Sequence, residues 1–178
     1  MYDRFNRHIN YLRISVTDKC NLRCLYCMPA EGIQLLRHQD ILSYEEIVDI
    51  VQYAVKEGVT KIRLTGGEPL VRRGVVNLVK MIAQIRGVED FSMTTNGVLL
   101  KDYASELARS GLDRVNVSLD TLDPEKYAQI TRGGDIHKVL EGLTEAKKQG
   151  LTPVKINMVV GEWTNEKDKA DLQEFSIK

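Results

Sequence analysis

The sequence lacks the features that mark secreted and membrane proteins. It contains only three cysteines in 178 residues, and this small, odd number argues against the disulfide framework of a secreted domain. The N-terminal sequence MYDRFNRHINYLRISV has no apolar run of the signal-peptide kind, and no segment approaches the roughly 18 apolar residues of a membrane helix. We therefore expect a cytoplasmic protein that makes no contact with a membrane.

An excess of charge of one sign is also missing. Lys and Arg number 25, and Asp and Glu also number 25, so the net charge is zero. A protein without a basic field has no general attraction for nucleic acid, so we expect no nucleic-acid partner. The hydrophobic content of 43% is sufficient for a buried core, and the length fits one domain or a large part of one.

What the sequence does contain is a regular alternation of short β-branched runs with amphipathic stretches, which is typical of parallel α/β folds. Ser43 and Glu46 predict a capping box at the start of one helix, and Gly58 marks its end. Strands are predicted over residues 11–17, 60–65, 91–95, 114–119 and 153–160, and further helices over 74–86, 103–110, a short stretch after 123, and 135–150. The pattern predicts a TIM-type βα barrel or a doubly wound parallel sheet.

The predicted strands carry polar residues at every second position, although strands of a parallel sheet are usually apolar on both faces. The polar sets, one for each strand, are Arg13, Ser15 and Thr17; Arg63 and Thr65; Thr94 and Asn96; Asn116, Ser118 and Asp120; Lys155 and Asn157. An open sheet with one face in water is one explanation. A barrel whose polar inner face forms a pocket is the other, and the three cations would suit an anionic ligand there.

All three cysteines lie in the segment DKCNLRCLYCMP, directly after the first predicted strand. Three thiolates could bind zinc if a histidine, His8 or His38, supplied the fourth ligand. They could also hold a [4Fe-4S] cluster in which one iron lacks a protein ligand and can bind a small molecule. The residues alone leave both kinds of metal site open.

Two motifs resemble the signatures of radical S-adenosylmethionine (SAM) enzymes. One is Cys-x3-Cys-x2-Cys with an aromatic residue, Tyr26, before the last cysteine, and the other is GGEP at residues 66–69. Over nearly the whole chain, the segments YLRISVTDKCNLRCLYCMP, IRLTGGEPLVRR, TTNG, VNVSLDTLD and VKINMVV are similar to the GTP 3',8-cyclase family of molybdenum cofactor biosynthesis.

The resemblance implies a set of ligands and contacts. It implies that Cys20, Cys24 and Cys27 hold the catalytic [4Fe-4S] cluster, whose open iron binds the amino and carboxylate groups of SAM. Tyr26, Gly67 and Ser118 would contact SAM, and Arg13, Arg63, Thr94 and Lys155 would contact GTP. Glu68 and Asp120 are either further ligand contacts or structural caps.

The resemblance also implies a reaction. A reducing electron donor supplies an electron to the cluster, SAM is cleaved to methionine and a 5'-deoxyadenosyl radical, and the radical removes hydrogen from C3' of GTP. The sugar radical then attacks C8 of guanine and gives (8S)-3',8-cyclo-7,8-dihydroguanosine 5'-triphosphate. This lyase activity is the first step of molybdenum cofactor biosynthesis.

Members of that family are longer and carry a second three-cysteine cluster in a C-terminal region, whereas this sequence has no cysteine after Cys27. We therefore expect residues 1–178 to be the N-terminal part of a radical SAM core, an incomplete TIM-type βα barrel that can bind the first cluster and SAM yet fail at cyclisation. The exposed last strand would favour association, for example as a homodimer. The alternatives are another radical SAM enzyme, a zinc-stabilised binding module, or a fragment without activity.

Overall fold

The computed structural model describes residues 2–177 and contains a five-stranded parallel sheet. The strands follow one another in the sheet in chain order: β1 Tyr11–Ser15, β2 Lys61–Thr65, β3 Asp90–Thr95, β4 Arg114–Ser118 and β5 Lys155–Asn157. Parallel neighbours need a crossover connection, and here helical segments supply it. The predicted partial βα barrel is confirmed, with β1 and β5 as the two edges of the sheet.

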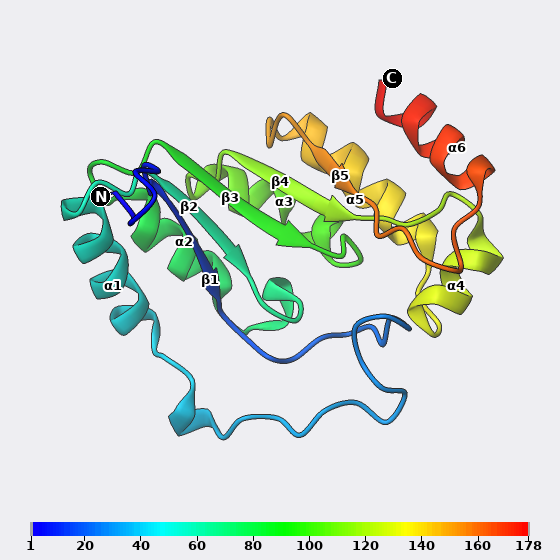
Figure 1. Ribbon diagram of the computed structural model, residues 1–178, viewed down its shortest axis with the longest axis horizontal. Coiled ribbons are helices and arrows are strands. Elements are labelled where there is room, and N and C mark those ends of the chain that lie inside the picture. Colours follow the sequence, from blue (N-terminus) through cyan, green and yellow to red (C-terminus); the bar gives the residue numbers. More distant parts are fainter. Residues whose placement is uncertain (1, 178) are drawn as a thin grey trace.

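Among the described residues, six helices accompany the sheet: α1 Tyr44–Lys56, α2 Val75–Ala83, α3 Leu100–Arg109, α4 Pro124–Thr131, α5 Ile136–Lys148 and α6 Glu166–Ile177. Two short 3-10 turns, η1 His38–Asp40 and η2 Pro69–Val71, complete the elements. Figure 1 shows α1, α2, α3 and α5 along one face of the sheet, with α4 beyond the ends to which the strand arrows point. Within residues 2–177 no helix has the length and apolar character needed to cross a membrane.

The core lies between the apolar face of the sheet and these helices. Its strand residues include Ile62, Leu64, Phe91, Met93, Val115 and Val117, and its helix residues include Val51, Val79, Leu107 and Val139. Because side chains alternate along a strand, burying this apolar set leaves the polar set of each strand on the opposite face.

The predicted element boundaries are partly right. The capping box is confirmed, because Ser43 Oγ accepts from the Glu46 amide (3.1 Å) and Glu46 Oε2 accepts from the Ser43 amide (2.7 Å). The fifth strand is shorter than predicted, because the amide of Val159 donates to the Asp120 carboxylate instead of to a neighbouring strand. The first strand ends two residues early, at Ser15, and α3 begins three residues early, at Leu100.

Candidate functional site

The predicted polar residues share one face of the sheet, as the strand register confirms. Arg13 pairs with Arg63, Arg63 with Ser92, Thr94 with Asn116, Asn116 with Lys155, and Ser118 with Asn157. This is the face opposite the apolar core. Contacts of these residues with a ligand stay predictions.

Three cations on this polar face have no acidic partner. Arg63 Nε donates to Ser92 Oγ (3.1 Å), but Arg13, Arg63 and Lys155 are absent from the ion pairs formed within residues 2–177. Arg114, which the sequence analysis did not single out, differs because Asp90 pairs with it at 2.7 Å. The three unpaired cations therefore give this face a positive potential that an anion would neutralise.

The cysteine loop, residues 18–29, is fixed at its start by the backbone of Gly67 and the residue after it, which follow β2. The amide of Gly67 donates to Thr17 O (2.7 Å), and the next amide donates to Lys19 O (2.8 Å). A Cβ at Gly67 would lie only 2.3 Å from Lys19 O, so this approach of two backbones requires glycine. The family resemblance implies a contact of Gly67 with SAM, and the structure shows a close approach of Gly67 to the chain itself.

Glu68 has a structural role. Its side chain is fully buried, Oε1 accepts from the Leu70 amide (3.0 Å) and Thr95 Oγ1 (2.8 Å), and Oε2 accepts from the Asn96 amide (2.6 Å). Burial raises the pKa of this carboxyl, although the three hydrogen bonds oppose the shift. Both oxygens are engaged, and of the two predicted roles the structure supports the cap, which joins η2 to the end of β3.

The middle of the cysteine loop is attached to the end of α4. The amides of the residues on either side of Cys24 donate to the carbonyl oxygens of Ile130 (2.9 Å) and Thr131 (3.2 Å). Arg132 then donates to two loop carbonyls, one at 3.0 Å and the other, Met28 O, at 2.7 Å. These contacts place Cys24 against the end of α4, and the sequence did not predict this attachment.

The surroundings of Cys20 and Cys24 favour the protonated form of these two thiols at neutral pH. Burial raises the pKa of Cys24 to about 11, with further contributions from Cys20 and Asp120, and burial also raises the pKa of Cys20. Asn96 Nδ2 lies 3.8 Å from Cys20 Sγ and donates to it. A metal that binds these sulfurs must displace their protons, and Asn96 is then placed to donate to a thiolate.

The donor set fits a cluster better than a single metal ion. Within residues 2–177 no group of three or more His, Cys, Asp and Glu side chains is placed to hold one metal ion. A structural zinc needs four donors within about 2.0–2.3 Å of one point, and His8 instead packs against Tyr2. A [4Fe-4S] cluster takes each thiolate at a different iron. The three thiols of this loop can therefore supply ligands to three of the four irons.

Tyr26 is held by two contacts beside the cysteines. Its hydroxyl donates to Asp120 Oδ2 (2.8 Å), Asp120 Oδ1 accepts from the Val159 amide (2.8 Å), and its ring stacks on Trp163 with centroids 5.1 Å apart. Burial raises the pKa of Tyr26, so the phenol stays protonated and donates. The sequence did not predict Trp163, although a single tryptophan in the loop after the last strand was a usable signal.

A cavity of about 430 Å³ opens beside Cys20. Its lining comes from the cysteine loop and the segment after it, including Asp18, Arg23, Glu31 and Ile33. None of the predicted GTP-contacting residues lines it. The thiols lie beyond the carboxyl end of the sheet. The four residues predicted to contact GTP lie on the polar face of the sheet, outside this cavity.

Comparison with known proteins gives a family and a set of close relatives. Residues 14–175 match the family described as the Radical SAM superfamily. The chain is 58% identical over 99% of its length to a GTP 3',8-cyclase from Thermodesulfovibrio yellowstonii, and 50% identical to one from Geobacter sulfurreducens. It covers 54% of each of these relatives, so the chain spans about half the length of the curated relatives it matches.

Solved structures with the same fold are more distant in sequence. SuiB from Streptococcus suis, bound to S-adenosylmethionine, superposes with a TM-score of 0.80 at 22% identity, over 94% of this chain and 38% of SuiB. Methylornithine synthase (PylB) gives a TM-score of 0.76 at 20% identity, over 94% of this chain and 50% of that protein. These similarities support the partial-barrel architecture.

Proposed function

The chain belongs to the radical SAM superfamily, whose members use a [4Fe-4S] cluster and SAM, and on that premise we propose that Cys20, Cys24 and Cys27 hold the cluster. The cluster, when bound and reduced, supplies the electron that cleaves SAM. We propose further that the chain serves a GTP 3',8-cyclase, which forms (8S)-3',8-cyclo-7,8-dihydroguanosine 5'-triphosphate in molybdenum cofactor biosynthesis. The observation that carries the proposal is the position of all three thiols on one loop at the carboxyl end of the sheet.

The residues around the loop would have separate tasks. Gly67 and the end of α4 hold the loop's backbone, so the spacing of the thiols is set by the fold. Tyr26, Gly67 and Ser118 lie at the end of the sheet where SAM would bind. A fixed position for both SAM and substrate matters because a carbon radical reacts with any suitably placed C–H bond.

GTP would bind on the polar face of the sheet. That face carries three unpaired cations, Arg13, Arg63 and Lys155, and Thr94 on β3 adds a hydroxyl. A triphosphate carries several negative charges and needs several fixed donors, for which the guanidinium fork is well suited. The relatives named GTP 3',8-cyclase support the choice of this nucleotide.

The proposal includes a reducing electron donor and a cytoplasmic location, where iron–sulfur chemistry is protected from oxidation. It also includes a homodimer formed through β5. This strand is an edge of the sheet, and Lys155 and Asn157 on it are exposed. Exposed edge strands are common sites of association.

Anaerobic reconstitution tests the cluster. The chain is expected to take up about four iron and four sulfide per molecule, to turn brown, and to cleave SAM when dithionite is added. Cys27→Ser should lower iron uptake sharply, whereas His38→Ala should not. One colourless zinc per chain, lost in the His38→Ala variant, would refute the cluster and favour the zinc module.

A binding assay tests the nucleotide. Arg63→Gln and Lys155→Gln are each expected to weaken GTP binding by about tenfold, the effect of losing one charge-assisted contact of about 1.4 kcal/mol. Arg109→Gln is the matched control, because Arg109 ends α3 on the other side of the sheet. Equal affinity of all three variants and the parent would contradict the polar-face site. Binding of GDP and GMP with the same affinity as GTP would contradict recognition of the triphosphate.

A further inference from the structure

We propose that Trp163 is a positioning residue for the cysteine loop. It packs against the ring of Tyr26 and thereby holds the stretch between Cys24 and Cys27 in one conformation. What the loop holds rests on the proposed function, but the ordering of the loop by Trp163 does not. The two can therefore be tested separately.

The contact is a parallel stack between segments far apart in sequence. The ring centroids of Tyr26 and Trp163 are 5.1 Å apart and the ring planes differ by 20°. The Tyr26 hydroxyl is bound at the same time by Asp120, which also accepts from the Val159 amide. A ring fixed at one face and at its hydroxyl has little freedom left, and its neighbour in the chain is Cys27.

A tight turn presents Trp163 to the loop. The amide of Gly161 donates to Thr164 Oγ1 (3.0 Å), and the Thr164 amide donates back to Gly161 O (2.9 Å). The indole packs directly onto Gly161, where a Cβ would lie 2.5 Å from the ring. The turn therefore needs glycine at this position in order to hold the indole where it is.

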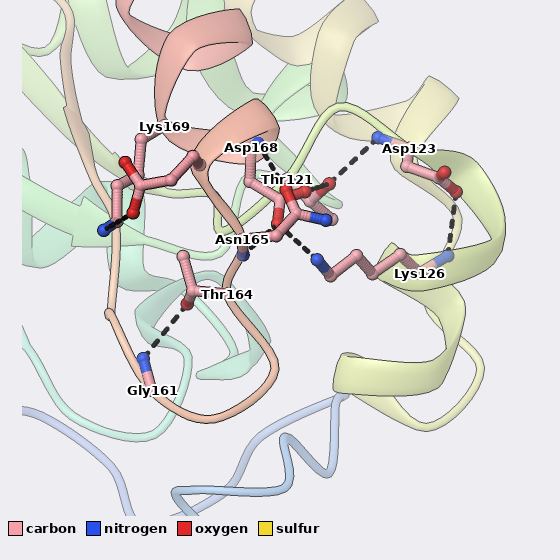
Figure 2. Close-up of polar contacts among 9 residues, drawn as sticks. Thr121, Asp123, Lys126, Gly161, Thr164, Asn165, Asp168 and Lys169 are labelled. Carbon is pink, nitrogen blue, oxygen red and sulfur yellow. Dashed lines mark hydrogen bonds and ion pairs between the residues drawn. The ribbon is translucent and has the colours of Figure 1, made fainter.

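The turn is anchored to the rest of the protein through Asp168 (Figure 2). The Asn165 amide donates to Asp168 Oδ2 and the Asp168 amide donates to Asn165 Oδ1, both at 2.8 Å, so the two residues cap α6 reciprocally. Asp168 also accepts from Thr121 Oγ1 (2.7 Å) and from Lys126 Nζ. Asp168 is 5% exposed, and this buried node ties the Trp163 turn to the end of β4 and to α4.

Trp163 therefore adds one more attachment of the cysteine loop to those at its start and at the end of α4. The end of α4 holds the backbone on both sides of Cys24, and Trp163 holds the side chain that precedes Cys27. A loop that is ordered before its ligand arrives loses less conformational entropy on binding. Loss of the stack should leave the fold intact but make the loop more mobile.

Thiol reactivity of the apo chain tests the ordering directly. Every cysteine of the chain lies in this loop, so an aromatic disulfide reagent reports on the loop alone. Trp163→Ala is expected to speed modification of the half-buried thiols, Cys20 and Cys24, by about two- to tenfold, the range that corresponds to an aromatic pair. Trp163→Phe should react like the parent, because it retains a ring and the indole N–H has no partner within residues 2–177.

Two further variants make the test specific. Tyr53→Ala removes an exposed aromatic residue from α1, away from the cysteine loop, and should change nothing. Tyr26→Leu removes the stack from the other side; it should accelerate the same thiols and also shift the fluorescence of the chain's single tryptophan. This variant decides the question if Trp163→Ala fails to fold.

Unchanged thiol rates in Trp163→Ala or in Tyr26→Leu would overturn the proposal, as would equal acceleration in Trp163→Phe and Trp163→Ala. The rate at which a chelator removes the bound cluster is a second measurement. It should rank the variants in the same order as the thiol rates. If the parent chain takes up no cluster, the proposed function fails. The thiol rates of the apo chain still decide the role of Trp163.

Discussion

Replacing Asp168 by alanine should destabilise the protein more than any exposed substitution on α6. The carboxylate accepts from three donors that belong to different parts of the chain: Thr121 Oγ1, Lys126 Nζ and the Asn165 amide. After its removal the Thr121 hydroxyl, in a residue 1% exposed, has lost its acceptor. The Lys126 ammonium, on a side chain 21% exposed, has lost its counter-charge.

The magnitude follows from these two losses. A buried donor without an acceptor costs about 1–3 kcal/mol. Removing one partner of a fully buried ion pair costs about 3–5 kcal/mol, but Lys126 is partly solvated, so we assign its loss about 1–2 kcal/mol. The sum is about 3 kcal/mol, which for a chain of this size corresponds to a fall in Tm of about 6–12 °C.

Urea unfolding followed by circular dichroism measures the effect. Glu166→Ala is the matched control on the same helix, because the Glu166 side chain is 89% exposed and its pair with Lys169 lies at the surface. It should change the free energy of unfolding by less than about 0.5 kcal/mol. Adding Lys126→Met to Asp168→Ala should restore part of the loss. An Asp168→Ala variant as stable as the Glu166→Ala variant would refute the reasoning.

The difference in stability between the parent and Asp168→Ala should depend on pH. Burial by itself raises the pKa of Asp168, but hydrogen bonds from Lys126, the Asn165 amide and Thr121 outweigh it and lower the pKa below the ordinary 3.8. A lowered folded-state pKa stabilises the protein above the unfolded-state value, and this stabilisation is lost as the pH falls through the folded-state value. The stability difference between the parent and Asp168→Ala should be constant from neutral pH to about pH 4.5 and shrink in stronger acid. A difference that grew in acid would contradict the assignment.

Two other substitutions test the packing around the cysteine loop. Tyr127→Phe removes a buried hydroxyl that has no partner within residues 2–177, so the free energy of unfolding should stay the same or rise by up to about 1 kcal/mol; a loss of more than that would show that the hydroxyl is bound. Gly67→Ala places a Cβ 2.3 Å from Lys19 O and should cost about 2 kcal/mol or more because two backbones must separate. Urea unfolding checks both, and a Gly67→Ala variant of parental stability would mean that Lys19 and Gly67 do not approach so closely.

Much of the architecture could be predicted from the sequence because it is recorded in local patterns. The alternation of polar and apolar residues along each strand placed Arg63 and Lys155 on one face, and the Ser43 capping box marked the start of α1. The attachments of the cysteine loop could not be predicted in this way. Arg132 and Trp163 contact loop residues more than 100 positions away, and such pairs leave no periodic signal.

The early end of β1 has the same origin. The local sequence continues to favour a strand after Ser15, but the segment up to Lys19 is directed by the backbone beyond β2, through the hydrogen bonds of Gly67 and its neighbour. Tertiary contacts therefore determined both where the strand ends and where the thiols begin.

The open arrangement of the sheet has a mechanical consequence. In a closed barrel, hydrogen bonds around the whole circumference fix its diameter. Here β1 and β5 are the outer strands of an arc, so bending of the sheet changes the span between them without breaking a backbone hydrogen bond. Arg13 lies on β1 and Lys155 on β5, so the curvature of the sheet sets the distance between these two charges. A polyanion bound by both residues would draw the two edge strands together and increase that curvature.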